Sequence, residues 1–249
     1  MQRLRDIELF NIPLTTTMLD RLCEVLSTRL YNVELWFCSY PADYTVQQAA
    51  LKIHRLQVGL SGLESIDTGP PPTALVAIVQ RSLSSIATLT LSSGMGLLAY
   101  LGTMPRLTSL ATDLGSDGDD DEGLKNFLVA NPQLVEFTLN QSFHKCPLLP
   151  PSALPNLRTI RVHNFKPIQH LIPGRPVAKV EIRKLSKFKS IVKGLRALPR
   201  STAPIVELTM RLHHHFTYLY DVLDAVVKVA PRLEIVSLSF QAEVRRILY

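Results

Sequence analysis

The stretch Leu157-Arg158-Thr159-Ile160-Arg161-Val162 decides how this chain folds, because its pattern returns along the whole sequence. The first, fourth and sixth residues of this hexad are apolar, and polar residues stand between them. In a β-strand, successive side chains point to opposite faces, so the fourth and sixth places face one side and the third and fifth the other. The same spacing recurs in Leu134, Phe137 and Leu139, in Val177, Val180 and Ile182, and in Ile205, Leu208 and Met210.

The first residue of each hexad, its anchor, recurs at intervals of 20 to 33 residues. Most of these intervals fall within the roughly 20–29 residues of a leucine-rich repeat. The longest interval contains Pro70-Pro71-Pro72, which indicates an inserted loop. The anchors are Leu4, Leu30, Ile53, Ile86, Leu107, Leu134, Leu157, Val177, Ile205 and Leu233.

Two hexads are irregular. The hexad of Leu107 and Leu110 has Thr112 at its last apolar place. The hexad of Ile53, Leu56 and Val58 competes with Leu63 and Ile66 as the strand, and the pattern leaves this choice open.

One such repeat cannot bury its apolar face alone, whereas stacked neighbours build a continuous core. We therefore predict an α/β leucine-rich-repeat solenoid of about ten irregular repeats, with a curved parallel β-sheet inside and helices on the convex side. We expect a single domain over residues 1–249, which further repeats could extend at either end.

The segments between hexads carry apolar residues at helical spacing. This spacing predicts helices over 15–27, 73–83, 94–101, 185–198 and 220–229, and one that begins at Asp120-Asp121-Glu122. Threonines before the first helix can cap it, and acids favour a helix start.

A proline stands two residues before four of the anchors, in Met104-Pro105-Arg106-Leu107, Asn131-Pro132-Gln133-Leu134, Leu154-Pro155-Asn156-Leu157 and Ala230-Pro231-Arg232-Leu233. Proline cannot continue a helix. We therefore expect it to end each crossover segment and to lead the chain into the next strand.

Composition agrees with a folded intracellular protein. Of the 249 residues, 46% are hydrophobic and 19% charged, which supplies material for a core. The three cysteines are far apart, which argues against a disulfide framework and against a zinc site. The first residues lack the apolar run of a signal peptide, and no segment approaches a membrane span. We expect a soluble, monomeric protein of the cytoplasm or nucleus.

The charges are unevenly distributed. Residues 1–124 hold 8 basic and 14 acidic side chains, a net of −6, whereas the remainder holds 19 and 7, a net of +12. Between 184 and 200 the basic residues are Lys184, Lys187, Lys189, Lys193, Arg196 and Arg200. Such a surface could bind nucleic acid or an anionic membrane. A solvated outer face is favoured instead, because a repeat protein needs polar residues there and no aromatic platform for base stacking is interleaved.

No pattern indicates catalysis, a cofactor or a resident metal. The acidic stretch 117–122 lacks the glycine and glutamate of a calcium-binding EF-hand loop. Neighbouring histidines on a strand, such as His213-His214-His215, point to opposite faces and cannot easily meet one ion. No Gly-x-Ser-x-Gly or phosphate-binding loop is present. Cys38 and Cys23 are expected to be buried structural residues.

The chain resembles the irregular leucine-rich-repeat proteins of the F-box type that are common in fungi. The residues that carry the resemblance are the turns NPQL, LPNL and APRL, the segment DDDEGLKNFLVANP and the strand LVEFTL. The resemblance implies the substrate-recognition part of a ubiquitin-ligase receptor. Because the first hexad begins at Leu4, no F-box is recognisable, so a ligase adaptor is expected as a partner only if an F-box precedes this chain.

We expect a protein ligand on the concave face, lined by the third and fifth places of the hexads and by the residues that follow them. From Arg161 to Arg211 this lining turns basic, and exposed arginine and tryptophan are favoured interface anchors. The alternative is that these side chains only keep the sheet soluble. The expected binding residues are Trp36, Glu136, Thr138, Thr159, Arg161, Lys179, Glu181, Arg183, Glu207, Thr209 and Arg211.

Overall fold

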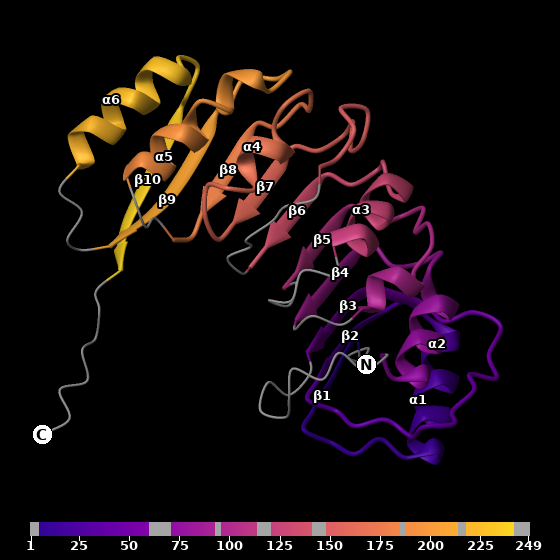
Figure 1. Ribbon diagram of the computed structural model, residues 1–249. Coiled ribbons are helices and arrows are strands. Elements are labelled where there is room, and N and C mark those ends of the chain that lie inside the picture. Colours follow the sequence, from indigo (N-terminus) through magenta and orange to yellow (C-terminus); the bar gives the residue numbers. More distant parts are fainter. Residues whose placement is uncertain are drawn as a thin grey trace, which may run out of the picture. The chain divides into compact units, whose positions relative to one another are not determined.

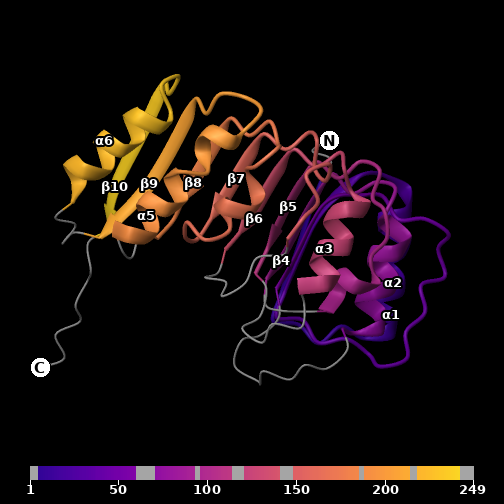
Figure 2. The same cartoon turned by 45° about the horizontal axis from the view of Figure 1, so that its top comes forward.

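The computed structural model describes residues 5–59, 71–92, 96–113, 121–140, 148–184, 188–213 and 218–241. It divides into two compact units, Met1–Leu134 and Val135–Tyr249. The single domain that the sequence predicts therefore stays a prediction. Each unit is an α/β structure in which helices lie on one face of a parallel β-sheet (Figures 1 and 2).

In the first unit the strands lie side by side in sequence order, and every pair is parallel. They are β1 (Asp6–Phe10), β2 (Tyr31–Trp36), β3 (Ile53–Gly59), β4 (Thr88–Ser92) and β5 (Ser109–Thr112). The segments that return the chain are α1 (Thr16–Thr28), α2 (Thr73–Ser82), the 3-10 helix η1 (Gly96–Tyr100) and α3 (Asp121–Ala130). Parallel neighbours need a crossover connection and not a tight hairpin, and these helices lie on one side of the sheet (Figures 1 and 2).

The second unit repeats this plan, again with parallel neighbours in sequence order. Its strands are β6 (Glu136–Leu139), β7 (Thr159–Val162), β8 (Lys179–Ile182), β9 (Glu207–His213) and β10 (Ile235–Gln241). Its helices are α4 (Ile168–Leu171), α5 (Phe188–Leu195), the 3-10 helix η2 (Leu198–Arg200) and α6 (Leu219–Val229).

The pairing register aligns the hexads place by place. In the second unit Ile160 pairs with Phe137 on one side and Val180 on the other, and all three are at most 2% exposed. In the first unit Leu56 on β3 pairs with Leu89 on β4 in the same way. From β2 to β9 the fourth and sixth places thus form the core, as predicted, whereas in the last hexad Val236 is 42% exposed. The pairing also identifies Ile53–Gly59 as the third strand, whereas Leu63 and Ile66 lie outside the described residues.

The prediction that the anchor Leu30 is buried with the rest of its hexad is wrong. It is 47% exposed, and its neighbour Tyr31 is buried instead. Tyr31 pairs with Ile53 while Asn32 pairs with Arg55, so β3 has one extra residue at this point. This β-bulge shifts the register locally and turns the tyrosine, not the leucine, inward.

The four proline turns have a common geometry. In each, the anchor's N–H donates to the carbonyl oxygen three residues earlier, as in Leu107 to Met104 (3.0 Å) and Leu233 to Ala230 (3.1 Å). This is the hydrogen bond of a β-turn with proline at its second position, which proline's fixed φ favours. The prediction that proline leads into each strand is therefore confirmed.

The helix predictions are confirmed in part. The hydroxyl of Thr15 accepts from the Met18 N–H at 3.3 Å and caps α1 as expected. The segment 94–101 is helical in its described part, but it forms the short 3-10 helix η1 and not an α-helix. The segment 185–198 is too long, since α5 ends at Leu195 and Pro199 lies within η2. The helix α4 was not predicted at all.

Candidate functional site

The face of each sheet that turns away from the helices carries the third and fifth places of the hexads. In the second unit these places form two rows across the strands, because the register aligns them. One row is Glu136, Thr159, Lys179, Glu207 and Ile235, and the other is Thr138, Arg161, Glu181, Thr209 and Ser237. Ten of the eleven expected binding residues belong to this unit, and Trp36 lies in the first.

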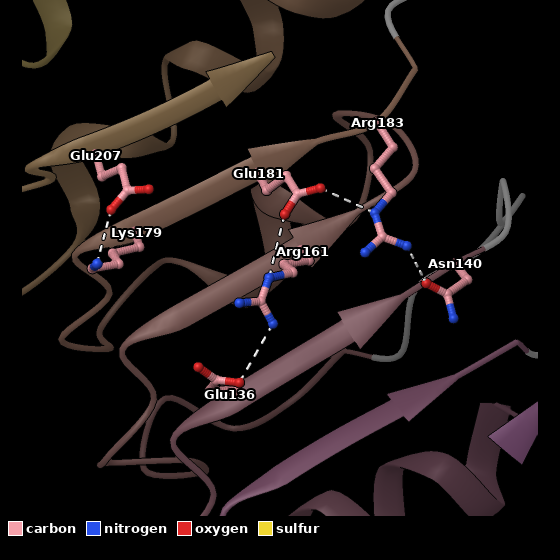
Figure 3. A network of polar contacts seen from close by, with 7 residues as sticks. All are labelled: Glu136, Asn140, Arg161, Lys179, Glu181, Arg183 and Glu207. Atoms are coloured by element: carbon pink, nitrogen blue, oxygen red, sulfur yellow. Dashed lines mark hydrogen bonds and ion pairs between the residues drawn. The ribbon is translucent and has the colours of Figure 1, made fainter. Parts of the chain in front are cut away.

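Arg161 lies at the centre of the polar network on this face (Figure 3). Its Nη1 lies 3.4 Å from an oxygen of Glu136 on β6, and its Nε lies 3.3 Å from Oε2 of Glu181 on β8. The Arg161 side chain is 37% exposed, so water screens both ion pairs. Exposed pairs of this kind contribute about 0–1 kcal/mol each. Their main effect is to hold the side chains in place across three strands.

Two further contacts extend the network (Figure 3). The other oxygen of Glu181 accepts from Nε of Arg183 at 3.1 Å, and Nη1 of Arg183 donates to Oδ1 of Asn140 at 2.6 Å. At the other side of the face, Lys179 Nζ lies 2.8 Å from Glu207 Oε2.

These ion pairs correct the expectation of a basic lining. Three of its four cations pair with the acids Glu136, Glu181 and Glu207 on the same face. Arg211 is exposed and is the cation that no such pair neutralises among the described residues. The face is therefore a mixed network of charges with hydrogen-bonding capacity of both kinds.

Thr138 is a second correction. It occupies a fifth place and was expected to face a ligand, yet it is only 7% exposed. Thr159 and Thr209, which occupy other outward places, are half-buried. Thr138 is therefore too covered to contact a partner directly.

His163 follows β7 at the carboxyl end of this face and is half-buried. Its pKa is lowered, first because burial penalises the charged imidazole, and then because the positive charges of Lys184 and Arg183 lie near it. A hydrogen bond to the Asn140 backbone acts in the opposite direction. A proton on His163 would thus be the third positive charge at this edge, and the fold resists it.

We expect this pKa shift to make the fold less stable in acid. Above an unfolded-state pKa of about 6.5 the imidazole is neutral in both states and contributes nothing. Below it, the unfolded chain binds the proton more readily than the folded chain, so stability falls as the pH falls. Urea unfolding at two pH values on either side of 6.5 should show a smaller loss for His163→Gln than for the wild type. His54→Gln, at an exposed position on β3, is the control, and equal losses for His163→Gln and wild type would contradict the assignment.

In the first unit Trp36 lies at the carboxyl end of β2, half-buried. Its Nε1–H donates to Oε2 of Glu34 at 3.1 Å, and the other oxygen of Glu34 accepts from Gln57. A Cβ added to Gly59 on β3 would lie 2.1 Å from Cε3 of Trp36, so the indole lies directly over this glycine. Only a residue without a side chain leaves room for the ring here.

Two phenylalanines complete an aromatic ledge, which we define as Phe10, Trp36 and Phe37. The Phe10 and Phe37 rings meet edge to face with centroids 5.1 Å apart, and those of Trp36 and Phe37 lie 6.3 Å apart. Phe10 is 63% exposed. Neither phenylalanine is among the expected binding residues. Phe10 directly follows the hexad of Leu4, as Trp36 follows that of Leu30, and the two pair in the register, so the same rule applied to the first hexad would have found it.

The two described cysteines are structural, as predicted. Cys23 is fully buried, and this burial raises the pKa of its thiol. Cys38 is 6% exposed, and its thiol donates to the carbonyl oxygens of Leu9 and Trp36 at 3.5 and 3.6 Å. It therefore ties the loop after β2 to the carboxyl ends of β1 and β2.

Several sequence features lie outside the described residues, namely the calcium-like stretch up to Asp120, His214 and His215, and Cys146. Within the described ranges, no three potential metal-ligating side chains come together, and none of the helices there has the length and apolar character to cross a bilayer. No family model matches this chain, and no curated protein matches it significantly.

Proposed function

We propose that this chain is a leucine-rich-repeat protein without catalytic activity, which binds another protein through the exposed face of its strands. Its repeats are the strand and crossover units of 20 to 33 residues defined by the anchors. The resemblance to F-box-type repeat proteins suggests the substrate-recognition part of a ubiquitin-ligase receptor, and this role depends on an F-box that the sequence does not display.

The observation that carries this proposal is the register of the outward places. Side chains far apart in sequence are brought into one polar network, Arg161 and Glu136 being 25 residues apart and Arg183 and Asn140 43 residues apart. The residues of this network are held by one another at the surface, so little side-chain entropy remains to be lost when a partner binds. A preformed face of this kind favours recognition of a large partner over chemistry on a small one.

The face itself can be tested by photo-crosslinking. A photoreactive phenylalanine analogue would be placed at Thr159 or Thr209 on the exposed face, or at the exposed Lys193 or Lys228 on the helix side. Incubated with an extract of the source organism, the full chain should form adducts with the same protein at the first two positions and not at the other two. Adducts only from the helix side, or at no position, would overturn the proposal.

Once the partner is known, Arg161→Ala should weaken binding at least about fivefold, as expected for an arginine at the centre of an interface. The variant should remain folded, because the ion pairs of Arg161 are exposed. Lys228→Ala, which removes an exposed cation on α6, is the matched control.

The alternative function is electrostatic binding of nucleic acid or anionic membrane. The observation in its favour is that Lys193, Arg196 and Arg200 are exposed on the helix side, away from the neutralised strand face. Binding to duplex DNA and to vesicles with anionic lipid, measured at about 50 and 200 mM salt, separates the two functions. Tight, steeply salt-dependent binding that Lys193→Gln with Arg196→Gln removes would favour the alternative.

A further inference from the structure

The aromatic ledge of the first unit is an exposed apolar surface at the carboxyl ends of β1 and β2. Phe10 is 63% and Phe37 36% exposed. Large aromatic side chains are usually buried, and their clustering at a surface marks an interaction site more often than a single exposed residue does. The ledge lies on the outward side of the sheet, because Phe10 follows Glu8, and Trp36 follows Glu34, at a spacing of two residues.

The ledge is held rigidly. Trp36 is fixed by the hydrogen bond to Glu34 on one side and by contact with Gly59 below. Phe37 has a φ of 58°, a left-handed conformation that is rare for a bulky residue. The equivalent residue after β1, Asn11, has a φ of 53°, and asparagine adopts this conformation more easily. A phenylalanine with this φ therefore costs backbone energy that an asparagine would largely avoid.

The charges beside the ledge differ from those of the second unit. Asp6, Glu8 and Glu34 share this face with one cation, Arg55. In the second unit each acid of the strand face is paired with an arginine or lysine. In the described part of the first unit, by contrast, no ion pair involves Asp6, Glu8 or Glu34; Asp6 and Glu34 accept hydrogen bonds only from neutral donors.

We propose that the ledge docks a polypeptide segment of the partner in which lysine or arginine alternates with apolar residues. The apolar side chains would cover Phe10 and Phe37, and the cations would meet Glu8 and Glu34 and the indole of Trp36. A cation against the face of a tryptophan is attracted by the ring quadrupole, and the nearby carboxylates strengthen this attraction. This inference rests on the proposed function and names the chemistry of the partner at the strand face of the first unit.

Trp36 offers a local reporter, because it is the single tryptophan of the chain. Its fluorescence would be followed while the full chain is titrated with a short blocked peptide of alternating arginine and leucine. Matched peptides replace arginine by glutamate or by glutamine. The chain has a net charge of +6, so general attraction should favour the acidic peptide. A response to the arginine peptide alone, weaker at higher salt, is the expected result.

Two double variants separate the components of the site. Phe10→Ser with Phe37→Asn removes the apolar part of the ledge and retains Trp36, while Glu8→Gln with Glu34→Gln removes the charge. Each should raise the dissociation constant for the arginine peptide at least about tenfold, as hot-spot and charge-pair losses do. The matched control is Glu24→Gln with Val25→Ser, an exposed acid and an exposed apolar residue on α1. Urea unfolding of each variant shows that it is folded.

An equal response to all three peptides, no response, or unchanged binding by both double variants would overturn the docking of a basic segment. A fluorescence change when the protein alone is concentrated would also overturn it, and would identify a second copy of the chain as the occupant. If the peptide fails while crosslinks at Thr159 and Thr209 still form, only this inference falls. If those crosslinks fail too, the proposed function falls with it.

Discussion

Replacing Arg175 by methionine is expected to lower the free energy of unfolding by about 3–5 kcal/mol, because several buried carbonyl oxygens lose their hydrogen-bond donor at about 1–3 kcal/mol each. Arg175 is 1% exposed and is the largest fully buried side chain of the described residues. Methionine replaces the stem of the arginine but ends near the position of Nε. The loss therefore combines the hydrogen bonds of the guanidinium with the space that its Cζ and Nη atoms leave.

Those hydrogen bonds join three parts of the second unit. Nε donates to the carbonyl oxygen of Ala153 at 2.8 Å, and Nη2 donates to that of Pro150 at 2.9 Å. Nη1 lies within 3.1–3.2 Å of three carbonyl oxygens at the end of α4 and just beyond it, those of His170, Leu171 and Pro173. The last carbonyls of a helix have no partner within the helix. Arg175 therefore completes α4, which at four residues is too short to be stable by itself.

The measurement is urea unfolding at neutral pH, in which a change of midpoint without a change of slope reports stability. Arg175→Lys should recover only part of the loss, because an ammonium group cannot donate in all the directions of a guanidinium. The control is Arg158→Met, at an exposed arginine that makes a single 3.4 Å contact with the Pro176 carbonyl, and should change stability by about 0.5 kcal/mol or less. Similar losses for Arg175→Met and Arg158→Met would contradict this account.

The second large effect is expected at Ile160, where alanine should cost about 2–5 kcal/mol, as for other buried isoleucines. Ile160 is 0% exposed and lies between Phe137 and Val180 in the middle of the sheet of the second unit. Its removal leaves a cavity that side chains from three strands border. Rigid neighbouring strands can close such a cavity only in part, so most of the cost should remain.

The next residue in sequence is the control. Arg161 points to the other face, its side chain is 37% exposed, and Arg161→Ala should cost only about 0–1 kcal/mol. Urea unfolding of the two variants thus compares adjacent residues on opposite faces of one strand. Comparable losses would mean that the alternation of buried and exposed places is wrong. The pair also separates fold from function, because Arg161→Ala should weaken partner binding while Ile160→Ala should act through stability alone.

Under the proposed function, the charges of the strand face serve recognition and contribute little to folding. Arg161, Glu181 and Arg183 form a connected set of partly exposed ion pairs, which are weak in water and yet fix side-chain positions. The aromatic ledge of the first unit differs, because it combines apolar contact area with acids that no ion pair neutralises among the described residues. The strand faces of the two units therefore differ in their chemistry.

The sequence by itself determined the strands and their alignment, except at the third strand, where it left two candidates open and did not show the register shift. The alternation within each hexad identifies which residues are buried, and a shift of one place would expose the whole apolar set, so the register has one solution. This is why the row of Phe137, Ile160 and Val180 follows from the pattern alone. The proline turns and the Thr15 cap could also be predicted from the sequence, because they depend on residues only a few places apart.

Tertiary structure decided everything that depends on a neighbouring repeat. Because of the bulge in β3, Tyr31 is buried in the core in place of Leu30, and no local sequence pattern predicts this bulge. Thr138 is covered although its place in the hexad is an outward one. The burial of Arg175 and the pairing of Arg161 with Glu136 and Glu181 depend on groups 4 to 25 residues away. The spacing of apolar residues and the residues that form turns act within one repeat. Burial and charge pairing, by contrast, are set by side chains that meet only after the repeats stack.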